Sequence, residues 1–260
     1  MPTALFLSPH LDDVAFSCGG ALLSLVDARW RVILCTLFTA SVPDPQGFAL
    51  RCQTDKGILP ETDYMALRRA EDEAYAAQSG ATEARHWEYR EAPHRGYDSP
   101  AALFAGARAG DDIWQSLRDD LVLLDAETRP DLVFAPQGLG NHVDHLQTIR
   151  AVLAVYPVAR RVCWYRDTPY AIREPGARPA DALADAGLAV RRWPLSADLL
   201  ARKIAGCTLY VSQIPFQFGG ADGTREKLHA FHRQEAGGSP ESGEYAETFL
   251  AAADEPFPPL

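Results

Sequence analysis

Apolar residues recur along this chain with two different periods. Short runs rich in aliphatic and β-branched residues predict strands, and longer stretches with apolar residues three or four positions apart predict helices. The two kinds of segment follow one another through most of the sequence. The pattern predicts strands at residues 3–7, 31–38, 86–89, 131–136 and 161–165, and helices at residues 19–29, 63–80, 111–125, 144–155 and 197–210.

Alternating strands and helices are typical of α/β proteins. We therefore expect a Rossmann-like, mostly parallel sheet flanked by helices, with the active site at the carboxyl ends of the strands. With 260 residues, 47% of them hydrophobic, the chain suits a single domain over 1–260. Glycine and proline residues after about residue 213 indicate an irregular C-terminal portion.

The stretch 63–80 carries the clearest helix pattern, with Asp63 as its expected N-cap and Gly80 as its end. Arg68 and Glu71 lie three residues apart on a face beside its apolar stripe. The stripe consists of Met65, Ala66, Ala70, Ala74 and Ala77. Before this helix, residues 39–63 read as a long polar loop, which is a candidate substrate lid because it follows a strand's carboxyl end.

Charge and composition exclude several kinds of partner. There are 25 Lys and Arg against 35 Asp and Glu, a net charge of −10, with no basic run for binding nucleic acid or an acidic membrane surface. No stretch approaches the roughly 20 apolar residues of a membrane span, and no leader precedes the first strand. Five scattered cysteines favour reduced thiols, so we expect a cytoplasmic protein. Homo-oligomer formation is left open by the sequence.

The first cluster of chemically active residues follows the first predicted strand directly. His10 and Asp13 lie three residues apart in a tight turn, so both side chains can reach one side while adjacent Asp12 points elsewhere. His145 would complete the two-histidine, one-carboxylate set of an open catalytic zinc site. Asp12 then stays free to take a proton from water.

A second cluster follows the strand at 131–136. His142 lies three residues before His145, so both flank the site if the turn is helical. His142 can donate a proton to an oxyanion or a departing nitrogen, and Asp144 can orient or charge an imidazole. As alternatives, Asp12 or Asp144 is a helix N-cap and His142 is a loop histidine.

These residues resemble the signatures of the PIG-L or LmbE-like zinc-dependent de-N-acetylases, which hydrolyse the acetamide of N-acetylglucosaminyl compounds. The resemblance spans roughly residues 4–213 and is carried by spaced motifs. The first motifs are Pro9-His10-Leu11-Asp12-Asp13 with Gly19-Gly20, and His142-Val143-Asp144-His145. Further matches are the Arg-x-x-Glu helix motif at Arg68-Arg69-Ala70-Glu71 and a C-terminal motif of Lys203 with Ser212-Gln213.

The resemblance implies Zn²⁺, or another divalent metal, bound by His10, Asp13 and His145. It implies Asp12 as the general base that acts on water. The activity it implies is removal of acetate from a small-molecule N-acetylated amino sugar.

The same resemblance gives His142 the role of oxyanion stabiliser or acid, and Asp144 the role of tuning His142. Arg68 would hydrogen-bond sugar hydroxyls. Two other functions remain open: a metal-dependent hydrolase of another amide or ester, and a carbohydrate-binding relative without catalysis. The presence of Asp12 and His142 disfavours the latter, because binding alone requires neither.

Overall fold

The computed structural model describes residues 1–156, 162–184, 187–237 and 244–253. Within these ranges, seven strands form one sheet in the order β3-β2-β1-β4-β5-β7-β6. The strands are β1 (Thr3–Ser8), β2 (Arg31–Thr36), β3 (Glu83–His86), β4 (Leu132–Pro136), β5 (Val162–Tyr165), β6 (Leu188–Leu195) and β7 (Tyr245–Ala252).

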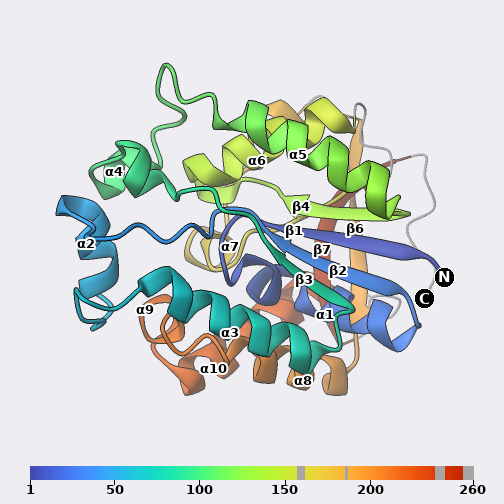
Figure 1. Cartoon of the computed structure of the whole chain (residues 1–260). Helices are drawn as coiled ribbons and strands as arrows, with labels where there is room; N and C mark the ends of the chain where they lie inside the picture. The colour runs from blue at the N-terminus through green and yellow to red at the C-terminus, as the bar shows by residue number, and fades with distance from the viewer. Residues whose placement is uncertain (157–161, 185–186, 238–243, 254–260) are drawn as a thin grey trace.

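Helices cover both faces of this sheet, with α5 and α6 on one side and α1, α3, α8 and α10 on the other (Figure 1). The longer helices are α1 (Asp13–Asp27), α3 (Tyr64–Ser79), α5 (Ile113–Thr128), α6 (Val143–Val155), α8 (Ala197–Cys207) and α10 (Ala221–Ala236). The shorter ones are α2 (Gly47–Thr54), α4 (Pro100–Leu103), α7 (Tyr170–Arg173) and α9 (Ile214–Phe218), with 3₁₀ turns at Ala92–Arg95, Leu139–Asn141 and Asp181–Leu183.

The predicted α/β architecture is confirmed. Strands β1 to β5 pair in parallel, so their carboxyl ends share one edge of the sheet. Individual bounds differ from the expectation at several ends: β3 lies at Glu83–His86 instead of 86–89, and α1 begins at Asp13 instead of 19. Residue 161, the expected start of β5, lies outside the described residues, as do parts of the expected 1–260 domain.

The portion after residue 213 differs from the expected irregular tail. It contains α9, α10 and β7, and β7 is inserted antiparallel between β5 and β6. The sequence of α10 is polar, with Leu228, Phe231 and His232 among its few buried positions, so its apolar period is too weak to read. The region 39–63 likewise contains a helix, α2, within the expected loop.

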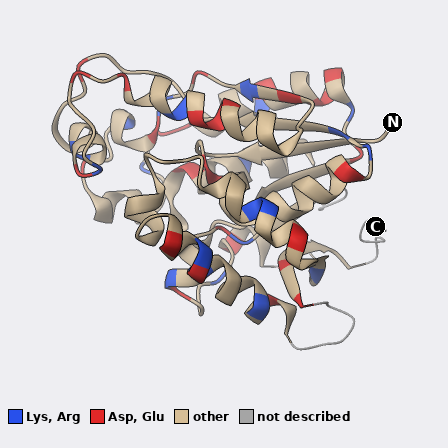
Figure 2. Cartoon of the chain, turned by 90° about the horizontal axis from the view of Figure 1, so that it is seen from below, with Lys and Arg blue, Asp and Glu red and all other residues tan. Residues whose placement is uncertain are grey.

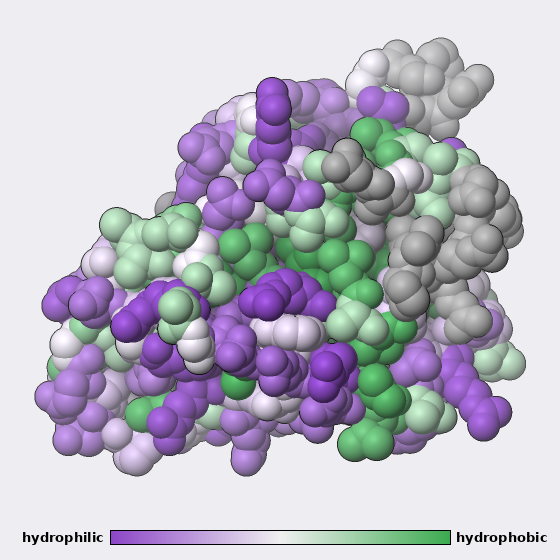
Figure 3. All heavy atoms as spheres, turned by 90° about the horizontal axis from the view of Figure 1, so that it is seen from above, coloured by the Kyte–Doolittle hydropathy of each residue, from purple (hydrophilic) through white to green (hydrophobic). Residues whose placement is uncertain are grey.

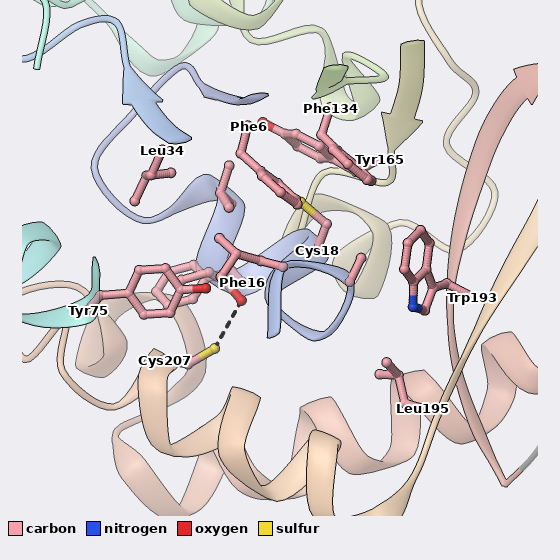
Figure 4. Close-up of a cluster of buried hydrophobic side chains, with 14 of the residues drawn as sticks. Phe6, Phe16, Cys18, Leu34, Tyr75, Phe134, Tyr165, Trp193, Leu195 and Cys207 are labelled. Carbon is pink, nitrogen blue, oxygen red and sulfur yellow. Dashed lines mark hydrogen bonds between the residues drawn. The ribbon is translucent and has the colours of Figure 1, made fainter. Parts of the chain in front are cut away.

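Alternate residues of the strands pack into two hydrophobic cores, one on each face of the sheet. Phe6 of β1 and Phe134 of β4 are paired in register and stack with their ring centroids 4.1 Å apart. They belong to the core under α1 and α8, which Figure 4 shows together with Trp193 and Tyr165. Residues of the opposite parity, such as Leu5 and Val133, pack under α5 and α6. Both faces are buried, as expected of parallel strands.

Helix α3 confirms its predicted ends but not its predicted buried face. The Asp63 side chain accepts from the backbone N–H of Ala66 at 2.9 Å, and Gly80 closes the helix in the left-handed conformation. The stripe residues Ala70, Ala74 and Ala77 are exposed. Met65 is the stripe residue that is buried, and the rest of the inward face consists mainly of Arg68, Glu71, Asp72 and Tyr75. Polar side chains turn inward because the pocket and its supporting network lie on that side.

A buried ionic network holds the middle of α1, where Cys18 interrupts the helical backbone. The Glu247 carboxylate of β7 accepts the N–H groups of Gly20 and Ala21 at 2.8 and 2.7 Å. Lys203 of α8, itself fully buried, donates to Glu247 at 2.7 Å and to the carbonyl of Ser17 at 3.2 Å. The network therefore ties α8 and β7 to α1, the helix that carries Asp12 and Asp13 at its start.

Charged residues of both signs are mixed along the helices on the α8 and α10 side (Figure 2). The surface of the molecule on the α5 and α6 side is mostly hydrophilic, with hydrophobic residues gathered near its middle (Figure 3). In the described part of the chain, no helix combines the length and apolarity needed to cross a bilayer.

Candidate active site

A pocket of about 310 Å³ opens at the carboxyl edge of the parallel strands. His10, Asp12 and Asp13 come from the turn between β1 and α1, and His142 comes from the start of α6; all four line the pocket. His145 lies immediately behind them and is fully buried. The structure thus brings the two predicted clusters together.

Three potential ligand atoms form a compact triangle. Oδ2 of Asp13 lies 3.3 Å from Nδ1 of His10 and 3.3 Å from Nε2 of His145, and the two nitrogens are 3.4 Å apart. Tetrahedral zinc ligands at about 2.1 Å from the ion stand about 3.4 Å from one another. The donor set and its spacing therefore fit a divalent ion.

Each imidazole in the triangle is oriented by a carboxylate on its other nitrogen. Nε2 of His10 lies 3.0 Å from Oδ2 of Asp144, and Nδ1 of His145 lies 2.5 Å from Oδ1 of Asp167. Donation to these carboxylates leaves the lone pairs of His10 Nδ1 and His145 Nε2 facing Asp13. Such carboxylate–histidine pairs are the usual support of metal-ligating histidines.

The electrostatics of the triangle suit a cation. Burial lowers the pKa of His145, but Asp13 and Asp167 outweigh it and raise the pKa to about 9. Burial raises the pKa of Asp13, yet His145 and His10 hold it well below its usual range. The carboxylates around the triangle stabilise positive charge on the imidazoles. The same negative field stabilises a bound metal ion, which takes the place of the proton on the ligand nitrogen.

His142 differs from the other two histidines in its hydrogen bonding. Its Nδ1 accepts the backbone N–H of Asp144 at 3.3 Å, so Nε2 carries the hydrogen in the neutral ring. Burial, followed by the positive field of His10, lowers the pKa of His142 to about 3 and keeps the ring neutral. Nitrogens of His10, His142 and His145 lie within 4.8 Å of one another, but an Nε2–H group is a donor and not a ligand. The arrangement therefore favours the tighter set with Asp13.

The Asp144 carboxylate is placed differently from the expectation that it tunes His142. Its Oδ2 accepts from His10 and from the backbone N–H of Ala92 at 3.0 Å, and Arg95 lies 2.8 Å from Oδ1. Its hydrogen bond to His142 comes from the backbone N–H, while the charge of its carboxylate raises the pKa of His142 against the larger effect of burial. The physical reason is the position of Asp144 at the first turn of α6, where its side chain points across to the β1 turn while its amide points back at residue 142.

Asp12 lies beside the triangle with a different environment. Burial, offset by Arg68 and reinforced by Asp13, raises its pKa to about 7. The nearest cation is Arg68, whose guanidinium lies 3.6 Å from Oδ1 of Asp12. Asp12 occupies the N-cap position of α1 but its side chain makes no capping hydrogen bond. The carboxylate is therefore available to the pocket.

Arg68 lines the pocket from α3, yet it is already paired. Its NH1 donates to Glu91 at 2.6 Å and its NH2 to the carbonyl of Leu11 at 3.4 Å. Its Nε has no hydrogen-bond partner among the residues that the structure describes. Glu71, its neighbour in the expected motif, points away and accepts from the backbone and hydroxyl of Ser212 at 2.8 and 2.7 Å. Gln213 lines the pocket beside them.

Sequence reasoning missed three supporting residues: Glu91, Arg95 and Asp167. Each stands alone in the sequence without a spacing motif. A signal existed for Asp167, because it follows β5 directly and β5 ends at the same edge of the sheet as β1 and β4.

Comparison with known proteins agrees with this geometry. The family model PIG-L, described as GlcNAc-PI de-N-acetylase, matches residues 5–156. The chain belongs to this family. The match includes His10, Asp12 and Asp13 as well as His142, Asp144 and His145. The elements α8 and β7, which contact α1, lie beyond it.

Among individual relatives, the 2'-N-acetylparomamine deacetylase of Streptomyces fradiae is 34% identical over 171 residues, which are 64% of this chain. The match spans only 57% of that relative's length. The zinc-inhibited form of a teicoplanin deacetylase is similar in structure, with a TM-score of 0.79, 25% identity and coverage of 97% and 100% of the two chains. The deacetylase of the A40926 pseudoaglycone has a TM-score of 0.76, 27% identity and coverage of 95% and 96%.

Proposed function

We propose that this protein hydrolyses the acetamide of an N-acetylated amino sugar, an N-acetylglucosaminyl conjugate, with release of acetate. The single observation that carries the proposal is the triangle of His10, Asp13 and His145, with Asp12 and His142 beside it in one pocket. Family membership supports it. So do the relatives, which are named as deacetylases of 2'-N-acetylparomamine, of teicoplanin and of the A40926 pseudoaglycone.

His10, Asp13 and His145 would hold Zn²⁺ or a neighbouring divalent ion. When bound, the ion supplies Lewis-acid activation of water and of the acetamide carbonyl. Asp144 and Asp167 hold the two imidazoles in the tautomers that leave the ligand atoms free. Asp144 thus has two positioning roles. Its carboxylate orients the His10 ring, and its backbone N–H orients the His142 ring.

Asp12 is the proposed general base. Its carboxylate removes a proton from water while the oxygen forms a bond to the acetamide carbon, and it returns that proton to the amide nitrogen as the C–N bond breaks. A pKa raised towards 7 by burial suits a group that must first accept and then donate. The second proton of the water passes from the new carboxyl group to the amine, so the products are acetate and an ammonium group, and atoms and charge balance.

His142 is the proposed oxyanion donor. Its Nε2–H, fixed by the bond at Nδ1, can hydrogen-bond the carbonyl oxygen as negative charge develops there. Arg68 lies on the opposite wall, where it holds Asp12 and Glu91 and can reach sugar hydroxyls.

The proposal also includes a reducing, cytoplasmic setting. The five cysteines form no disulfide bond, and four of them are buried, which supports this setting.

The direct test is acetate release from a panel of N-acetylglucosaminyl conjugates, with and without a chelator, beside the Asp12→Asn variant. The proposal expects turnover that the chelator abolishes, that added Zn²⁺ restores, and that Asp12→Asn lowers. Chelator-insensitive turnover, or turnover restricted to esters, would contradict it. Sugar binding without any acetate release would make the chain a non-catalytic relative.

A further inference from the structure

The pocket has an outer zone that the hydrolysis itself does not use. Three phenylalanines line it from separate segments: Phe48 in α2, Phe104 directly after α4, and Phe216 in α9. These segments lie at the same end of the molecule (Figure 1). Phe104 is 39% exposed and Phe216 is 58% exposed, so the mouth presents large aromatic surfaces to solvent.

This aromatic surface is continuous with the catalytic end of the pocket. The Phe104 ring lies edge-on to His142 with centroids 5.4 Å apart, and edge-on to Tyr170 at 5.9 Å. A group attached to a sugar whose acetamide faces His142 would therefore lie against Phe104. Covering exposed aromatic surface with an apolar or aromatic group is favourable because it removes that surface from water.

Two cations, Lys56 and Arg173, line the same pocket. The Lys56 ammonium lies 5.4 Å from the centroid of the Phe216 ring and 5.3 Å from that of Tyr64. Arg173 donates to the side chain of Gln217 at 2.7 Å. Neither Lys56 nor Arg173 forms an ion pair with any described residue. Apart from Asp12 and Asp13 at the catalytic end, the acidic residues that line the pocket are Asp55 and Glu91, and Glu91 is paired with Arg68. The mouth is thus locally basic, although the chain carries a net charge of −10.

We propose that this outer zone binds an aromatic, acid-bearing group attached to the amino sugar. The inference rests on the proposed function and names its substrate class. Phe48, Phe104 and Phe216 supply the apolar contact, and Lys56 and Arg173 attract the acid. A polycationic group such as an aminocyclitol would meet two like charges and is disfavoured.

Four glycosides of N-acetylglucosamine with the same anomeric configuration test this: methyl, phenyl, 4-carboxyphenyl and 4-(aminomethyl)phenyl. The measured quantity is kcat/KM for acetate release. We expect the phenyl glycoside to exceed the methyl glycoside by about tenfold, since the ring buries apolar surface. The carboxylate should exceed the ammonium compound by about threefold to tenfold at low salt, and less at high salt. Equal values, or preference for the ammonium compound, would overturn the proposal.

Variants assign the effects to residues. Phe216→Ala should lower the phenyl-to-methyl ratio by about fivefold, and Lys56→Met should remove most of the carboxylate-to-ammonium preference. Leu123→Ala on α5 and Arg225→Met on α10 are matched controls, because both residues are exposed and lie outside the pocket. Both controls should keep the parental ratios. Parental ratios in Phe216→Ala and Lys56→Met would place the selectivity elsewhere and contradict the proposal.

Failure of the proposed function is distinguishable from failure of this inference. If no glycoside releases acetate, the proposed function fails, and calorimetric titration of the same four glycosides still measures the outer zone. The same order of affinities would support the aromatic, acid-binding zone, whereas equal affinities would refute it.

Discussion

Nε2 of His10 lies 3.0 Å from Oδ2 of Asp144, and this bond determines which nitrogen of His10 faces Asp13 and His145. The carboxylate that the sequence assigned to His142 therefore serves a ligand histidine. One residue, Asp144, joins the two clusters: its side chain orients the first and its backbone amide orients His142.

The first prediction concerns this bond. Asp144→Asn keeps a carbonyl acceptor but removes the charge, so Zn²⁺ affinity should fall by about 10- to 100-fold, the usual effect of losing a carboxylate behind a ligand histidine. Competition with a chelating dye measures it. Asp131→Asn is the control, because Asp131 accepts the N–H of Thr3 at the opposite end of β1. Unchanged affinity in Asp144→Asn would show that His10 needs no such partner.

The second prediction separates His142 from the ligands. His142→Ala should bind Zn²⁺ with parental stoichiometry and lose turnover by about 10²- to 10³-fold, because it removes an oxyanion donor. His142→Gln, which retains an N–H donor, should recover part of the loss. Loss of the metal in His142→Ala would instead make this residue a ligand.

The third prediction concerns Asp12. Asp12→Asn should retain the metal and reduce turnover by about 10²- to 10⁴-fold, since an amide cannot accept the proton from water. Metal content and steady-state kinetics on the same preparation check both parts. Parental turnover would mean that another group is the base.

The fourth prediction concerns stability. Lys203→Met leaves Glu247 buried without its cation, which should lower the free energy of unfolding by about 3–5 kcal/mol. Arg202→Met, one residue away but in an exposed pair with Asp27, should cost less than about 1 kcal/mol. The double variant Lys203→Met with Glu247→Gln should be less destabilised than the sum of the two single variants. Equal effects at 202 and 203, measured by urea unfolding, would argue against the network.

The sequence predicted the parallel part of the sheet and the meeting of His10, Asp13 and His145 at its edge, because both depend on local signals. Runs such as 3–7 have a strong apolar pattern, and His10, Asp13 and His145 follow strands that end at one edge. The apolar pattern gives the wrong buried face for α3, where the alanines of the predicted stripe are exposed and the charged residues Arg68 and Asp72 are buried. Hydrophobic periodicity fails there because the inner face of α3 supports a polar pocket.

The sequence also did not predict which residues far apart in the chain form hydrogen-bonded pairs. Lys203 and Glu247 are 44 residues apart, and His145 and Asp167 are 22 apart, so neither pair has a spacing motif. Strand β7 was missed because it follows α10 and inserts between β5 and β6, a connection that no local pattern predicts.

The most direct test of the central claim is an anomalous difference map, recorded at the zinc edge from a crystal of the zinc-loaded protein. The account predicts one peak about 2.0–2.2 Å from Nδ1 of His10, a carboxylate oxygen of Asp13 and Nε2 of His145, with an open position towards the pocket. His142 should lie outside the ligand set. A zinc ion bound by His142 in place of Asp13, or enclosed by four protein side chains, would contradict the account.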